Sequence, residues 1–110
     1  MGRENDAAVA RARVVEAASQ VLAGLLSPIL AARELLGLMV RLDVPSEDPD
    51  FATFELIESE TDALPVGPER REWAPDALER LAVDIARSER WARETGHDAF
   101  QSVVRRWGAA

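Results

Sequence analysis

The chain contains no cysteine and no lysine among its 110 residues. Without cysteine it has no disulfide bond, no thiolate zinc site and no cysteine nucleophile, which fits a reducing cytosol. All thirteen basic residues are arginine, and alanine is frequent, a combination typical of a GC-rich bacterial genome. Arginine also favours planar pairing with carboxylates.

Long apolar runs are also missing. The longest apolar stretch, residues 21–40, is interrupted by Gly24, Ser27-Pro28 and Arg33-Glu34, so it is unsuited to crossing a bilayer. The first six residues are polar and do not resemble the apolar region of a signal peptide. The sequence therefore predicts a cytoplasmic protein without a membrane span.

Basic residues are absent from one segment, and the net charge of −7 is concentrated there. Residues 42–64 hold eight carboxylates and no arginine: Asp43, Glu47, Asp48, Asp50, Glu55, Glu58, Glu60 and Asp62. Elsewhere acids and arginines nearly balance, and no basic cluster exceeds two neighbouring arginines. Such a surface repels phosphates, which disfavours nucleic-acid binding and favours a basic protein partner.

Composition and periodicity together define the expected fold. A chain of this length forms one domain, and 47% hydrophobic with 30% charged residues is ordinary for a globular protein. Strand alternation and internal repeats are not found. We expect an all-α, single-domain bundle of four to five helices over residues 1–110, with residues 1–6 disordered.

The first two helices have clear boundary signals. Apolar residues at three- and four-residue steps predict a helix over 6–23, which Gly24 ends in the left-handed conformation. Ser27 and Pro28 are typical N-cap and first-turn residues, predicting a second helix over 28–42. This helix is so apolar that it is either the central one or contacts another subunit through residues 29–40.

The remaining elements follow from prolines and spacing. Residues 42–49 and 59–67 are predicted loops, and Asp48-Pro49 is expected to cap a short third helix carrying Phe51, Phe54 and Ile57. Pro68 opens a single turn through Trp73. Pro75-Asp76 opens a last helical region, in which we expect a break at Gly96 because glycine costs a helix interior about 1 kcal/mol.

The segment from Ser59 to Trp73 is the most motif-like part of the chain. Its acids, together with Arg70 and Trp73, suggest one of two interpretations. Either the loop has a function, or contacts between its own residues hold it in place. In the second interpretation Glu60 or Asp62 accepts a bidentate bond from Arg70, while Leu64 and Trp73 dock into the core. The candidate interaction or loop-ordering residues are Glu55, Glu58, Glu60, Asp62, Arg70 and Trp73.

The pattern S-E-T-D-x-L-P-x-G-x-x-R-x-x-W, present from Ser59 to Trp73, resembles that of small uncharacterised bacterial proteins. In those proteins an apolar helix precedes the motif and an acid-rich helix follows it. The resemblance covers about residues 22–92. It implies a helical cytoplasmic protein of unassigned function and supplies no catalytic residues.

Catalytic, cofactor and metal signatures are weak. His97 is the single imidazole, Glu94-x-x-His97 occurs once where a di-iron bundle needs two such repeats, and no Gly-x-Ser-x-Gly or glycine-rich phosphate loop is present. We therefore assign no catalytic, cofactor-binding or metal-binding residue and expect a non-enzymatic protein. An enzyme or metal-binding protein built on Glu55, Glu58, Glu60, Asp62 and His97 is an alternative.

The preferred functional hypothesis is a small acidic module that acts through protein–protein contacts. Immunity proteins that neutralise basic nuclease toxins share this character as a class. A structural homo-oligomer that uses residues 29–40 is the other alternative. Within the acidic segment, we expect Asp43 to Asp50 to be solvated and free, and Glu55 to Asp62 to be partly neutralised by Arg70 and Arg71.

Overall fold

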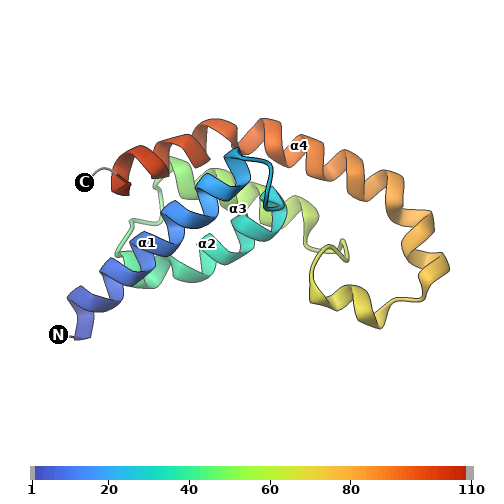
Figure 1. Cartoon of the computed structure of the whole chain (residues 1–110), viewed down its shortest axis with the longest axis horizontal. Coiled ribbons are helices and arrows are strands. Elements are labelled where there is room, and N and C mark those ends of the chain that lie inside the picture. The colour runs from blue at the N-terminus through green and yellow to red at the C-terminus, as the bar shows by residue number, and fades with distance from the viewer. Residues whose placement is uncertain (1, 109–110) are drawn as a thin grey trace.

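Four α-helices and one short 3-10 helix follow one another along the part of the chain that the structure describes (Figure 1). The computed structural model describes residues 2–108, and no β-strand occurs among them. The elements are α1 (Gly2–Leu22), α2 (Pro28–Leu42), α3 (Pro49–Thr61), the 3-10 helix η1 (Pro68–Glu72) and α4 (Pro75–Trp107). The predicted all-α, single-domain bundle of four to five helices is confirmed.

Prolines in the first turn start α2 and α3, each after a residue that caps it. The Ser27 hydroxyl accepts a hydrogen bond from the Leu30 N–H at 3.2 Å, and the Asp48 carboxylate accepts from the N–H groups of Asp50 and Phe51. These bonds satisfy backbone donors that have no partner within the helix. The predicted bounds of α2 match at both ends.

The ends of α1 show one agreement and one difference. Gly24 adopts φ +78°, its N–H bonds to Val21 O, and the Leu25 N–H bonds to Gln20 O, a Schellman ending. At the other end α1 begins at Gly2, so residues 2–6, expected to be disordered, form the first helical turns. Met1 lies outside the described residues.

α3 is longer than predicted. It continues to Thr61, so the connection to η1 starts later than Ser59. The Thr61 hydroxyl is buried and donates a 2.6 Å hydrogen bond to Ile57 O, one turn earlier, which explains why a polar residue remains in the last turn. The turn expected from Pro68 is confirmed as η1.

The predicted break at Gly96 is wrong, because α4 runs unbroken from Pro75 to Trp107. Gly96 is buried where α4 crosses α3. A Cβ atom there would lie 2.8 Å from the Phe100 ring and 3.0 Å from Cδ1 of Ile57. The missing side chain therefore permits the close approach of two helices, and this packing outweighs the helix propensity that glycine lacks.

The four helices form a ring in which each contacts its neighbours. α1 packs on α2 and α4, and α3 packs on α2 and α4 (Figure 1). Three buried phenylalanine rings anchor α3: Phe54 lies 5.2 Å from Phe51 and 4.9 Å from Phe100, measured between centroids. These contacts fix the direction in which the solvent side of α3 points.

α2 lies largely within this core. Ile29, Ala31, Ala32 and Leu35 are fully buried, whereas Gly37 is exposed and Val40 is 93% exposed. Most apolar side chains of residues 29–40 therefore contact the chain's own helices. None of the helices in residues 2–108 combines the length and apolarity needed to cross a membrane.

A charged clamp joins α1 to α2. Arg13 donates to both carboxylate oxygens of Glu34, with Nη2 at 2.7 Å from Oε1, and also contacts Glu16. The hydrogen bonds that Arg13 donates hold the pKa of Glu34 below its usual range, and the same bonds raise the pKa of Arg13.

Replacing Glu34 with glutamine is expected to lower the free energy of unfolding at pH 7 by about 0.5–1 kcal/mol, since both side chains are about one-third exposed. Because the folded-state pKa of Glu34 is depressed, its contribution is complete above the unfolded-state pKa near 4.5 and is lost as pH falls through the folded value. Urea unfolding of wild type and Glu34→Gln should therefore converge at acidic pH. A difference in unfolding free energy between the two proteins that stays constant with pH would contradict the ion pair between Arg13 and Glu34.

Candidate functional site

Three of the predicted candidate residues lie along one side of α3 and its C-cap, Asp62. Glu55, Glu58 and Asp62 recur at steps of three and four residues, which places them on one helix face. Glu55 and Asp62 are exposed and Glu58 is half-buried. Among the described side chains, none of the three takes part in an ion pair. We call Glu55, Glu58 and Asp62 the acidic edge.

Glu60 does not belong to this edge. Two residues from Glu58, it points to another side of α3, where it lines a shallow hollow of ≈ 300 Å³ with Thr61, Arg87, Ser88 and Trp91 of α3 and α4. An arginine and an indole ring thus stand near this carboxylate. The four acids expected to act together are therefore divided between two sides of the helix.

Arg70 and Trp73 are not used as predicted. Arg70 is exposed, and no ion pair within residues 2–108 joins it or Arg71 to an acid of α3. Trp73 is 40% exposed instead of docked in the core. The segment does have ordering contacts, but they come from a residue outside it and not, as predicted, from Arg70.

Arg33 of α2 orders it. Its guanidinium donates to Thr61 O at 2.8 Å and Leu64 O at 3.3 Å, and pairs with Glu69 at 2.9 Å. The pKa of Glu69 lies below its usual range because of hydrogen bonds from its own backbone and from Arg33. The available signal for Arg33 in the sequence was a charge inside an otherwise apolar helix.

The internal neutralisation of acids occurs in the segment where it was not expected. Asp48 and Asp50 lie near the Arg106 guanidinium of α4, at 2.9 Å and 3.1 Å. The Ser102 hydroxyl also donates to Asp50 at 2.6 Å. The prediction that Asp43 to Asp50 is wholly free is wrong for these two residues, and the predicted neutralisation of Glu55 to Asp62 by Arg70 and Arg71 is not found.

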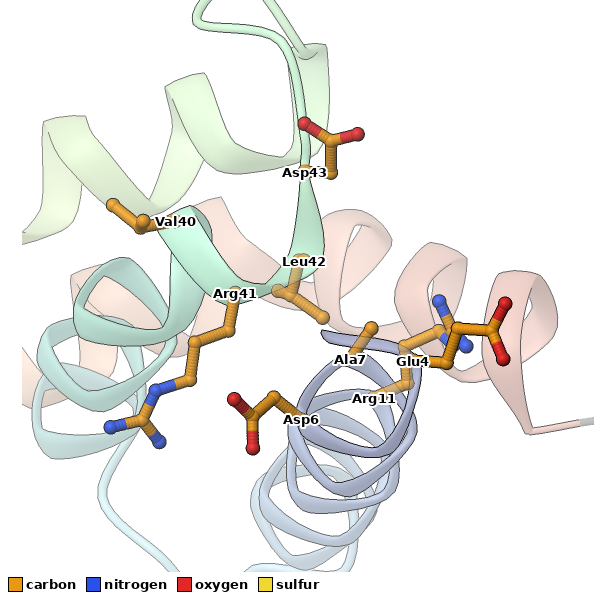
Figure 2. A pocket seen from close by; sticks show the side chains of 8 residues that line it. All are labelled: Glu4, Asp6, Ala7, Arg11, Val40, Arg41, Leu42 and Asp43. Atoms are coloured by element: carbon orange, nitrogen blue, oxygen red, sulfur yellow. The ribbon is translucent and has the colours of Figure 1, made fainter. Parts of the chain in front are cut away.

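A larger hollow, ≈ 410 Å³, opens between the start of α1 and the end of α2 (Figure 2). It contains none of the candidate residues. Its charged side chains are of both signs: Glu4, Asp6, Arg11, Arg41 and Asp43. Figure 2 shows the carboxylates of Glu4, Asp6 and Asp43 pointing in different directions, so this hollow gathers no convergent oxygen ligands.

The fold does not bring together the side chains that the metal-binding hypothesis requires. Within residues 2–108, no three histidine, aspartate or glutamate side chains stand together as metal ligands would. Glu94 and His97 both lie on exposed positions of α4. The candidate site is therefore a surface and not an enclosed pocket.

In comparisons with known proteins, no protein-family model, curated protein or solved structure matches the chain. The fold and the acidic edge define a small helical protein whose candidate site is one face of a well-anchored helix. The resemblance drawn from Ser59 to Trp73 stays a prediction.

Proposed function

We propose that this protein is a small, non-enzymatic, cytoplasmic module that binds a basic protein through the acidic edge of α3. The observation that carries the proposal is the arrangement of Glu55, Glu58 and Asp62, three acids on one helix face without ion-pair partners among the described side chains. Their charges are available to an approaching partner, whereas those of Asp48 and Asp50 are offset by Arg106.

The anchoring of α3 supports recognition as well as attraction. The adjoining side of the helix is fixed by Phe51, Phe54 and Ile57, all fully buried. Carboxylates on a fixed helix lose less conformational freedom on binding than carboxylates on a mobile loop. Complementary charge increases the association rate and makes it sensitive to salt. A role like that of an immunity protein, which blocks a basic toxin, fits these properties.

The homo-oligomer through residues 29–40 is the second hypothesis, and Val40 is the residue that favours it. Val40 is 93% exposed at the outer side of α2, although the rest of this stretch mainly lies against other helices of the chain. The substitution Val40→Glu tests that surface.

The main test reverses the acidic edge by combining Glu55→Arg, Glu58→Arg and Asp62→Arg. The matched control reverses three exposed acids elsewhere, Glu72, Glu94 and Asp98, and so changes the net charge equally. With a partner captured by the wild-type protein, we expect the edge variant to lose at least about tenfold in association rate. The control variant should retain most of the rate.

Circular dichroism must first show that both variants keep the helical content of the wild type. Binding rates measured over a range of ionic strengths then complete the test. Equal capture by both variants, or a rate that does not depend on salt, would overturn the electrostatic proposal.

A further inference from the structure

The last turn of α3 carries negative charge that the chain itself offsets only in part. Glu58 and Glu60 lie in this turn, Asp62 caps it, and it contains no basic residue. The C-terminal end of a helix is also the negative end of its dipole, so acids are unfavourable there and cations are favoured. Arg33 already bonds to this end through Thr61 O. A further cation on the other side of α3 would stabilise the remaining acids.

The hollow that Glu60 lines offers a place for such a cation. It lies between the end of α3 and the middle of α4 (Figure 1), and Ser88 and Trp91 line it from α4. Trp91 is half-buried, so part of its surface is accessible to a ligand. The volume of ≈ 300 Å³ is larger than a guanidinium group needs. We call this space the Trp91 hollow.

A carboxylate beside an indole ring distinguishes arginine from lysine. The planar guanidinium stacks on an aromatic ring and donates to a carboxylate at the same time, whereas the ammonium of lysine is compact and strongly hydrated. Glu60 makes no ion pair within residues 2–108. The Thr61 hydroxyl is already bonded to Ile57 O, so it adds no competing donor. The lining of the hollow therefore favours a guanidinium.

Arg87 also lines the hollow, and its charge opposes this use. Its position on α4 is exposed, and no ion pair among the described side chains holds its guanidinium in place. A long side chain at such a position keeps its charged end in water. The ≈ 300 Å³ is the space that remains with Arg87 present. Arg87 therefore weakens the attraction of the hollow for a cation but does not fill it.

We propose that the Trp91 hollow receives an arginine side chain of the basic protein that binds the acidic edge, with its guanidinium on the Trp91 ring and bonded to Glu60. This inference rests on the proposed function, since the arginine belongs to the same partner. The hollow and the acidic edge flank the exposed side of α3, on which Leu56 lies, so a partner that covers this helix reaches both. The acidic edge attracts lysine and arginine alike, and the hollow adds a preference for arginine.

Two capped peptides of equal length are the probes, one alternating glycine with arginine and the other glycine with lysine. Calorimetric titration at low ionic strength gives their dissociation constants. We expect the wild type to bind the arginine peptide at least about fivefold more tightly, the size of a partly exposed cation–π contact. Trp91→Leu should bind the two peptides equally. Trp91→Phe, which keeps an aromatic ring, should retain part of the preference.

Trp73→Leu is the matched control, because Trp73 is also partly exposed but lies outside the hollow. It should keep the preference of the wild type for the arginine peptide. Arg87→Gln should tighten the binding of both peptides by about two- to fivefold, because it removes the opposing charge. Circular dichroism shows whether each variant keeps the helical content of the wild type.

The variant that reverses the acidic edge separates this inference from the proposed function. It should weaken the binding of both peptides and leave the ratio of their dissociation constants unchanged. If it weakens neither, the electrostatic proposal itself fails, and if neither peptide binds the wild type, both proposals fail. Equal binding of the two peptides by the wild type, or the same loss of preference in Trp91→Leu and Trp73→Leu, would overturn the arginine site alone.

Discussion

Phe54→Ala is expected to lower the free energy of unfolding by about 3–5 kcal/mol, as for other buried phenylalanines. Phe54 is fully buried between Phe51 and Phe100, and its ring is a contact between α3 and α4. The truncation removes apolar contact and leaves a cavity that rigid neighbours fill only in part. For a domain of this size the melting temperature should fall by roughly 15–30 °C.

Leu56→Ala is the matched control for Phe54→Ala. It truncates a large apolar side chain on the same helix at a position that is 46% exposed. The loss there should stay below about 1 kcal/mol, because nearly half of the residue's surface already contacts water. Denaturant unfolding of both variants gives the comparison. Equal losses would show that α3 is not anchored by its phenylalanine face, which would also weaken the proposed role of the acidic edge.

Asp48→Ala is expected to lower the free energy of unfolding by about 2–3 kcal/mol. The Asp48 carboxylate is only 8% exposed and has two roles: it caps α3 through the N–H groups of Asp50 and Phe51, and it pairs with Arg106. Alanine removes the cap and takes away one of the two acids that face Arg106. The end of α3 and its link to α4 are weakened together.

Asp48→Asn separates the two roles. Asparagine retains an oxygen that caps the helix but carries no charge for Arg106, so the expected loss is about 1 kcal/mol. Glu47→Ala, at the exposed neighbouring position, should change stability by less than about 0.5 kcal/mol. If the asparagine variant were as unstable as the alanine variant, the capping role would be refuted.

The starts of α2, α3 and α4 could be predicted because their signals are local. Pro28, Pro49 and Pro75 fix the backbone of the first turn, and Ser27 and Asp48 supply the caps within three residues. Gly24 ended α1 as expected for the same reason. Each signal acts over one turn of helix, a range that sequence spacing describes directly.

Gly96 shows where local reasoning failed. Glycine's low helix propensity is a local cost of about 1 kcal/mol, and it predicted a break. The actual reason for glycine is the space occupied by Ile57, which lies on another helix. The identity of that neighbour depends on how α3 and α4 cross, which the spacing within α4 does not contain.

Charge pairing failed in the same way. Arg70 was expected to pair with Glu60 or Asp62 because they are close in sequence. The observed partner of Glu69 is Arg33, 36 residues away, and that of Asp48 is Arg106, 58 residues away. Flexible arginine side chains bind whichever carboxylates and carbonyls the packed helices bring within reach, so distance along the chain is a poor guide to pairing.

The sequence by itself determined the all-α class, the start of each helix after the first, and the concentration of acids between Asp43 and Asp62. Periodicity, caps and composition act within a few residues and need no knowledge of the fold. Tertiary structure alone decided which acids are neutralised and why α4 is continuous. These depend on contacts between helices distant in sequence, since only packing sets which side chains meet.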